Sequence, residues 1–200
     1  PFRGGEAGVA TIWGSSDGEA ARAVPSEGGH ASFASFDRET QEILDQLRKE
    51  VGWVVENEDL LSGKGIAALM RYYLESRSSQ IDETLDEILN ASASDQPRLI
   101  SRYAANHPVC RGVIRLFVKI YGRVSADFAS IVLPKRGLFL AGGIVGKNEE
   151  FFLDGNQFVH FFEQNECVQV KKILKEIPVY IIRNYSISLI GAANAGWVGR

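Results

Sequence analysis

Two short runs of β-prone residues lie near the start of the chain. Residues 8–13 read Gly-Val-Ala-Thr-Ile-Trp and residues 20–24 form a second run, with glycine, serine and aspartate at 14–18 between them. A polar, glycine-containing interval between two such runs is typical of a hairpin with a longer loop. The pattern therefore predicts a pair of strands joined in this way.

Apolar residues then recur at intervals of three and four, as on one face of an amphipathic helix. This spacing predicts helices over residues 39–51, from Ser62 onwards and over 82–89, with Asp37 as the N-cap of the first. The longest helix is expected to start after Pro108 and to end before Pro134, because proline cannot continue a helix. Its predicted buried face consists of Val113, Leu116, Phe117, Ile120, Val124, Phe128 and Ile131.

The pattern changes again in the last third of the chain. Residues 137–141 and 178–182 are continuous apolar runs, which predict strands, the first of them covered on both faces. The phenylalanine-rich segment 151–162 is interpreted as core or interdomain packing, since aromatic stripes are mostly buried. Strand, helix and strand in this order, with glycines where strands end, indicate an α/β layer architecture.

Composition narrows the class of protein. The chain has 200 residues, of which 45% are hydrophobic and 24% charged, as expected for one compact domain or two small ones. The net charge of -3 argues against a nucleic-acid or polybasic membrane partner. No apolar run approaches the roughly 20 residues that span a bilayer. A cytosolic protein is therefore expected, and because the chain starts at Pro1 without methionine, we interpret it as part of a longer protein.

Metal and disulfide chemistry receive no support from the sequence. Cys110 and Cys167 lie far apart and the three histidines are scattered, so neither a zinc site nor a disulfide framework is indicated. Both cysteines are expected to be reduced thiols, in the core or at the surface.

The first candidate for chemistry is the tetrapeptide Glu27, Gly28, Gly29, His30. Glycine lacks Cβ, so the backbone can bend sharply and approach a ligand closely. A carboxylate accepts two hydrogen bonds and a neutral imidazole offers one donor and one acceptor, which suits the adjacent hydroxyls of a polyol. A surface turn that carries a capping glutamate is the alternative interpretation.

The second candidate is the pair Gly142 and Gly143, which follows the apolar run 137–141. Ligands of open α/β sheets bind where buried strands meet their loops, and two glycines there allow a flat or charged ligand to lie against the backbone. An ordinary turn is the alternative. Lys64 and its flanking glycines lack the upstream glycine and strand of a phosphate-binding P-loop, so that interpretation is rejected.

Taken together, these segments resemble the bacterial glucokinases, sugar kinases of the superfamily that includes hexokinase, actin and the heat-shock ATPases. Residues 27–34 are similar to the hexose-binding signature of that family, 58–65 to its next block and 139–144 to its adenosine motif. Residues 177–182 and 188–193 resemble the closing strand and helix. The resemblance covers nearly all of this chain but only about the C-terminal two-thirds of the family pattern. It implies an α/β fold of the ribonuclease H-like, actin-like ATPase type, with a central mixed sheet, flanking helices and a helical insertion.

The resemblance also implies a function and site residues. The expected activity is ATP-dependent phosphorylation of glucose to glucose 6-phosphate, with Mg²⁺ neutralising the phosphates. Glu27, His30 and Glu58 would then hydrogen-bond the hydroxyls of glucose. Gly142 and Gly143 would pack against the adenosine of ATP, and Gly4, Gly5 and Gly8 would form the second phosphate-binding loop. Two weaker candidates, Ser62 and Asn184, have plain alternatives as a helix cap and a turn residue.

The chain departs from the family pattern in two places. Glu6 lies inside the expected phosphate loop, where a carboxylate would repel a triphosphate unless it points to solvent. The first phosphate loop and the Asn-Asp pair that supplies the general base lie upstream in the family, so no catalytic residue is assigned here. Residues 1–200 are therefore expected to be the larger, C-terminal domain, with the N-terminal domain as its partner, and to be a poor catalyst or none alone. The open alternative is a non-catalytic sugar-binding or regulatory relative; a homodimer is allowed.

Overall fold

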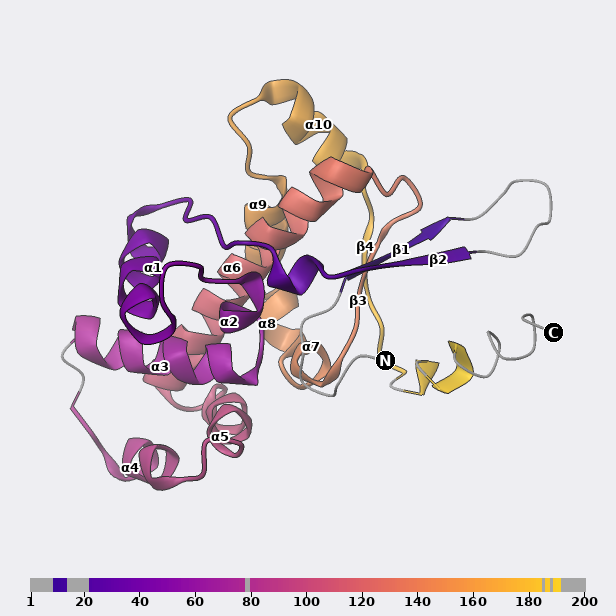
Figure 1. The fold of residues 1–200 in the computed structure, drawn as a ribbon. Coiled ribbons are helices and arrows are strands. Elements are labelled where there is room, and N and C mark those ends of the chain that lie inside the picture. Colours follow the sequence, from indigo (N-terminus) through magenta and orange to yellow (C-terminus); the bar gives the residue numbers. More distant parts are fainter. Residues whose placement is uncertain (1–8, 14–21, 78–79, 185, 188, 192–200) are drawn as a thin grey trace.

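A computed structural model describes residues 9–13, 22–77, 80–184, 186–187 and 189–191 of the chain. Helices form most of the body, and a β-hairpin extends from one side of it (Figure 1). The elements are, in order, β1 Val9–Trp13, β2 Arg22–Ser26, the 3-10 turn η1 Gly28–His30, α1 Arg38–Val51, α2 Asn57–Leu60, α3 Gly63–Arg77, α4 Glu83–Asn90, α5 Gln96–Tyr103, α6 Pro108–Val132, β3 Leu138–Leu140, α7 Gly143–Lys147, α8 Glu149–Leu153, η2 Asp154–Asn156, α9 Gln157–Glu163, α10 Val168–Glu176 and β4 Val179–Ile181.

The helices predicted from apolar spacing are present. Helix α1 is capped by Asp37, whose Oδ1 accepts a hydrogen bond of 2.9 Å from the backbone N–H of Thr40. Asp82 caps α4 in the same way. Helix α6 ends at Val132, and its C-cap Leu133 adopts a left-handed conformation before Pro134. Side-chain acceptors at N-caps satisfy backbone donors that the first helical turn leaves free. The cap predicted for α1 and the end of α6 before Pro134 are thus confirmed.

Helix α6 is the centre of the hydrophobic core. It contacts α2, α3, α5, α8, α9 and α10, and Val113, Phe117 and Ile120 on it are fully buried. The predicted buried face is wrong at its end, because Ile131 is 77% exposed. The apolar periodicity continues beyond Ala129, the last buried residue of the helix, into a turn that no described element covers.

The phenylalanine-rich segment folds as α8, η2 and α9, which pack on α6. Phe152, Phe158 and Phe162 are buried there, and the ring of Phe158 contacts those of the other two. Tyr121 of α6 lies 5.5 Å from Phe152 between ring centroids, edge to face. Tilted, edge-to-face and stacked pairs such as these add to the burial of the rings. The interpretation of this segment as packing is confirmed.

The described strands form two separate pairs. β1 and β2 are antiparallel, with Val9 opposite Ser26 and Trp13 opposite Arg22, which confirms the predicted hairpin; residues 14–21 lie outside the described part. β3 and β4 are parallel, with Leu138 opposite Val179. On this pair Phe139 is 55% exposed and stacks on Tyr180, so the expectation that both faces of the first strand are covered is wrong for this chain.

Three further observations bear on the class of protein. None of the helices in the described ranges has the length and apolarity to cross a membrane. Within the same ranges, no three His, Cys, Asp or Glu side chains are grouped so as to hold a metal ion. Cys110 is buried and Cys167 exposed, both as free thiols, and burial raises the pKa of Cys110 to about 12.

Helices α6 and α9 pack closely at Gly122. A Cβ added there would lie 2.7 Å from the carbonyl oxygen of Phe158, so the two helices would have to separate. We expect Gly122→Ala to lower the free energy of unfolding by about 1–3 kcal/mol, although alanine is otherwise favoured over glycine within a helix. Chemical denaturation measures this, with Gly143→Ala as the control, because a Cβ at Gly143 meets nothing within 4 Å. Equal stability of both variants would contradict the close packing of α6 on α9.

Candidate functional site

Two segments that are distant in sequence lie side by side at the candidate site. The backbone N–H of Phe33 donates to the carbonyl of Val55 at 2.7 Å, and that of Asn57 donates to Ala31 at 2.9 Å. The buried Asn57 side chain also donates to the carbonyl of Gly28 at 3.3 Å. These bonds join η1, which carries the glycine bend, to the start of α2. The sequence-predicted residues 27–30 and Glu58 are thereby brought to one place.

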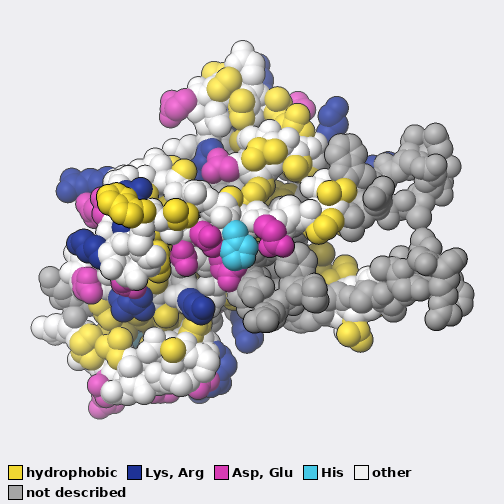
Figure 2. Space-filling model, viewed as in Figure 1, with side chains coloured by type: hydrophobic (Ala, Val, Ile, Leu, Met, Phe, Trp, Pro, Cys, Tyr) yellow, Lys and Arg dark blue, Asp and Glu magenta, His cyan; other side chains and the backbone are white. Residues whose placement is uncertain are grey.

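Two carboxylates lie next to the imidazole of His30 at this junction. Its Nδ1 lies 2.6 Å from Oε2 of Glu56, and its Nε2 lies 3.9 Å from Oε2 of Glu58. Figure 2 shows acidic side chains on both sides of a histidine at the place that η1 and α2 occupy in Figure 1. The imidazole side chain is 53% exposed, so a ligand can reach it from solvent.

One oxygen of Glu58 has no hydrogen-bond partner among the described residues. Its side chain is 22% exposed, but Oε2 is buried, and in the described part of the chain no group hydrogen-bonds to it. Buried polar atoms are nearly always hydrogen-bonded, and an exception calls for an explanation such as a missing ligand or water. The unpartnered oxygen faces His30 Nε2, and therefore a hydroxyl group placed between the two would satisfy it.

Carboxylates dominate the electrostatics of the junction. The pKa of His30 is raised above 6.5, first by the hydrogen bond to Glu56 and its charge, with smaller contributions from Glu58 and Glu27. Glu27 itself is exposed, and its carbonyl oxygen accepts a hydrogen bond of 2.9 Å from the backbone N–H of His30. All three sugar-site residues predicted from sequence thus meet here.

Sequence reasoning missed Glu56, the group in closest contact with the imidazole. It is the N-cap residue of α2, and its backbone N–H donates to Oδ2 of Asp59 at 2.8 Å. The signal present in the sequence was a second acid two residues before Glu58, in a stretch that was read only for its match at 58–65.

The structure describes two of the candidate glycines, Gly142 and Gly143. Gly142 follows β3 with φ of 111° as the N-cap of α7, and Gly143 begins that helix. A Cβ at either position would meet nothing within 4 Å, so the surface beside both glycines is open. Gly4, Gly5 and Gly8 lie outside the described residues, as does Glu6.

The contacts of Ser62 and Asn184 fit a helix cap and a turn residue, respectively. Ser62 is buried, and its Oγ accepts a hydrogen bond of 3.3 Å from the backbone N–H of Gly65 at the start of α3. Oδ1 of Asn184 accepts one of 3.0 Å from the backbone N–H of Ser186, as in a turn. These contacts support structural roles for both residues.

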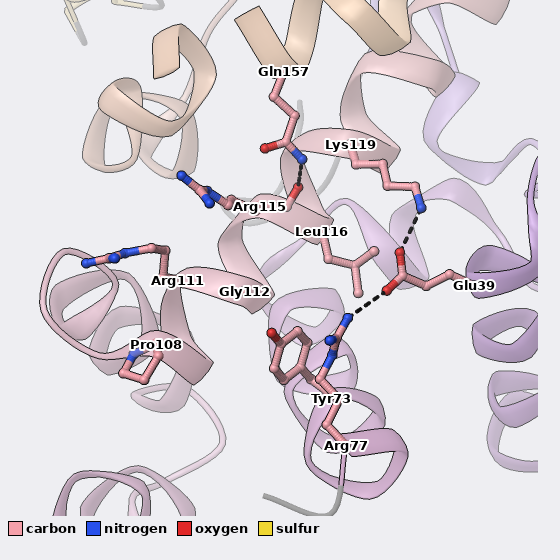
Figure 3. A pocket seen from close by; sticks show the side chains of 10 residues that line it. All are labelled: Glu39, Tyr73, Arg77, Pro108, Arg111, Gly112, Arg115, Leu116, Lys119 and Gln157. Atoms are coloured by element: carbon pink, nitrogen blue, oxygen red, sulfur yellow. Dashed lines mark hydrogen bonds and ion pairs between the residues drawn. The ribbon is translucent and has the colours of Figure 1, made fainter. Parts of the chain in front are cut away.

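A hollow of about 310 Å³ lies elsewhere, among α1, α3, α6 and α9 (Figure 3). Glu39 projects into it and accepts from Lys119 at 2.7 Å and from Arg77 at 3.5 Å, while Gln157 donates to the carbonyl of Arg115 at 2.9 Å. None of Glu27, His30 and Glu58 lines this hollow. Because its charged groups pair with one another across α1, α3 and α6, we interpret these contacts as structural, holding the helices together.

Comparisons with known sequences give a consistent result. The chain matches the family model described as Glucokinase over residues 4–196. It is 31% identical over 169 residues to the glucokinase of Photorhabdus laumondii, covering 84% of this chain and 49% of that protein. It is 35% identical to the glucokinase of Yersinia enterocolitica, covering 84% of this chain and 48% of the relative. The chain spans about half the length of the curated relatives it matches.

Comparisons of structure agree with this. The fold is similar to a glucokinase from an Antarctic psychrotroph, with a TM-score of 0.74 and 26% identity over 95% of this chain and 54% of that one. It is also similar to a glucokinase from Balamuthia mandrillaris solved in complex with glucose, with a TM-score of 0.73 and 21% identity over 89% and 47% of the two chains. At this lower identity the likeness concerns the fold.

The Asn57 side chain ties η1 to α2, so its removal tests the construction of the site. We expect Asn57→Ala to lower the free energy of unfolding by about 1–2 kcal/mol, since the hydrogen bond to Gly28 is lost from a buried position. Asn90→Ala is the matched control, because Asn90 is exposed and donates to the carbonyl of Asp86 within its own helix. Thermal denaturation compares the two. A loss no greater than that of the control would show that Asn57 does not hold η1 in place.

Proposed function

The chain belongs to the glucokinase family, and from this membership and the geometry of the site we propose that the intact protein transfers the γ-phosphoryl group of ATP to glucose. The proposal concerns the intact protein because this chain spans about half of its curated relatives. The observation that supports it most is Oε2 of Glu58, which no described residue hydrogen-bonds, beside the half-exposed imidazole of His30.

The arrangement suits a polyol. Glu27 and Glu58 act as hydrogen-bond acceptors and His30 as a donor or acceptor, so neighbouring hydroxyls of a hexose are paired one by one. A site built in this way rejects analogues that lack a hydroxyl, because a buried polar group is then left unsatisfied. The solved relative from Balamuthia mandrillaris contains glucose, and we propose glucose as the substrate here as well.

We propose that residues 1–200 form the larger, C-terminal domain of the enzyme. In the intact protein, β1–β2 and β3–β4 would belong to one central mixed sheet of the ribonuclease H-like type. The general-base aspartate would come from the N-terminal domain, because Glu27 and Glu58 are placed around the sugar ring. Proton removal from the attacking hydroxyl and positioning of the phosphoryl group are most of what such a protein supplies. This domain alone is expected to bind sugar but to turn over poorly or not at all.

The nucleotide is assigned to the glycines. Gly142 and Gly143 would pack against the adenosine, since the open space beside them admits a flat group, and Gly4, Gly5 and Gly8 would cradle the transferred phosphate. Mg²⁺ would be held mainly through phosphates and waters and would neutralise charge on the phosphates. The N-terminal domain as partner, a homodimer and a cytosolic location stay predictions.

A non-catalytic sugar-binding relative is the second candidate. It rests on Glu6, which lies outside the described residues, and the family match does not favour it. Turnover by the intact protein in a coupled ATP-to-glucose-6-phosphate assay separates the two functions, since only the kinase forms product.

Removal of the charge from Glu58 tests the sugar site. We expect Glu58→Gln to weaken glucose binding and to raise the KM for glucose roughly 10- to 100-fold, because hydrogen bonds to charged groups are worth about 1.5–3 kcal/mol. The KM for ATP should change less than about twofold, as the nucleotide is assigned elsewhere. Glu75→Gln, at an exposed position on α3, is the control. Unchanged glucose kinetics in Glu58→Gln would remove this residue from the sugar site.

A methyl group at Gly143 tests the nucleotide site. We expect Gly143→Ala to leave the unfolding temperature within about one degree of the wild type, because the added Cβ would meet no other atom within 4 Å. The KM for ATP should rise roughly tenfold, as the methyl occupies the surface against which adenosine packs. Steady-state kinetics with glucose in excess measure this. A normal KM for ATP would exclude close approach of the nucleotide to Gly143.

A further inference from the structure

Glu56 is held in place independently of the sugar-site residues. Its backbone N–H donates a hydrogen bond to Oδ2 of Asp59, and its backbone forms an isolated antiparallel β-bridge with Ser32, on the segment that follows η1. From this position its carboxylate lies 2.6 Å from His30 Nδ1. A hydrogen bond between an acid and an imidazole nitrogen at this distance fixes a proton on that nitrogen and orients the ring. The orientation of His30 therefore depends on Glu56.

The other ring nitrogen faces the unpartnered acid. His30 Nε2 and Glu58 Oε2 are 3.9 Å apart, which is too long for a direct hydrogen bond. A hydroxyl oxygen about 2.8 Å from both atoms, which is ordinary hydrogen-bond distance, would bridge them. Because Glu58 Oε2 is buried, the groups around it have to move apart when such a hydroxyl binds. The separation of the two atoms thus suits one bridging hydroxyl.

The number of hydrogen-bond donors available at this position determines which protonation state of His30 can complete the bridge. A hydroxyl group has one proton to donate, and a carboxylate can only accept. If Nδ1 carries its proton toward Glu56 and Nε2 carries none, both sides of the gap are acceptors, and one hydroxyl cannot satisfy both. If Nε2 also carries a proton, it donates to the hydroxyl oxygen while the hydroxyl donates to Glu58. Only the doubly protonated imidazole completes the bridge.

We propose that Glu56 is a positioning residue that keeps His30 doubly protonated, so that one substrate hydroxyl is held between His30 Nε2–H and Glu58. The inference rests on the proposed function for the identity of the substrate. Glu56 does not touch the sugar; it acts through the imidazole.

The surrounding charges favour this state. Glu56, Glu58 and Glu27 are the titratable groups that act on the ring, and all three raise the pKa of His30 above 6.5. A raised pKa means that the protonated form persists to higher pH. Glucose affinity is therefore constant below that pKa and falls as the pH rises through it, because the bridge loses its donor.

The experiment uses the intact protein and glucose, and it compares the wild type with Glu56→Gln and the control Glu75→Gln. Calorimetric titration gives the glucose Kd from about pH 5 to about pH 9, and the ¹⁵N shifts of the His30 ring report its protonation in the absence of sugar. Glutamine keeps the shape of the side chain but removes the charge. We expect the pKa of His30, and with it the alkaline fall in affinity, to move to lower pH in Glu56→Gln and to stay unchanged in the control. Glu56→Asp keeps the charge, so the pKa of His30 in this variant should lie between those of the wild type and of Glu56→Gln.

The outcomes separate the inference from the function on which it rests. Parallel movement of the ring titration and of the glucose profile in Glu56→Gln supports the proposal. If the wild type binds glucose but its affinity is flat across the alkaline range, or if Glu56→Gln leaves the profile unchanged, the inference is overturned and the function stands. A Glu56→Gln protein that loses affinity equally at all pH values also overturns it, since that indicates a structural role. If the wild type binds no glucose, both the inference and the proposed function are overturned.

Discussion

Burial of helix α6 is the constraint on which the rest of the structure depends. It contacts α3 and α5, which precede it, and α8, α9 and α10, which follow it, so the elements before and after it share one core. Contact is close enough at Gly112 and Gly122 that a side chain would collide with Tyr73 and with the backbone of α9. Interiors packed to this density transmit the position of one element to the next.

The geometry of the candidate sugar site depends on the packing of that core. Helix α3 packs on α6, and Gly65 near its start lies so close to the carbonyl of Leu60 that a side chain would not fit between α2 and α3. Backbone hydrogen bonds then join the start of α2 to η1. The spacing between His30 and Glu58 is thus a property of packed elements, and sites on such supports hold their geometry better than sites on free loops.

Much of this could be predicted from the sequence where local rules decide. Asp37, Asp82 and Pro134 mark helix ends because capping and proline chemistry act over a few residues. The exposure of Ile131 could not be predicted, since it depends on where covering elements stop. Glu56 was missed for the same reason: its contact with His30 spans 26 positions and is created by the pairing of two distant segments. Resemblance identified Glu58 only because its motif is local.

The central claim is that glucose binds at the junction of η1 and α2. A crystal structure of the intact protein with glucose tests it most directly. The account predicts a sugar hydroxyl within hydrogen-bond distance of both His30 Nε2 and Glu58 Oε2, with Glu27 on a neighbouring hydroxyl and Glu56 still bonded to Nδ1. A glucose molecule bound without contact to either His30 or Glu58 would contradict it.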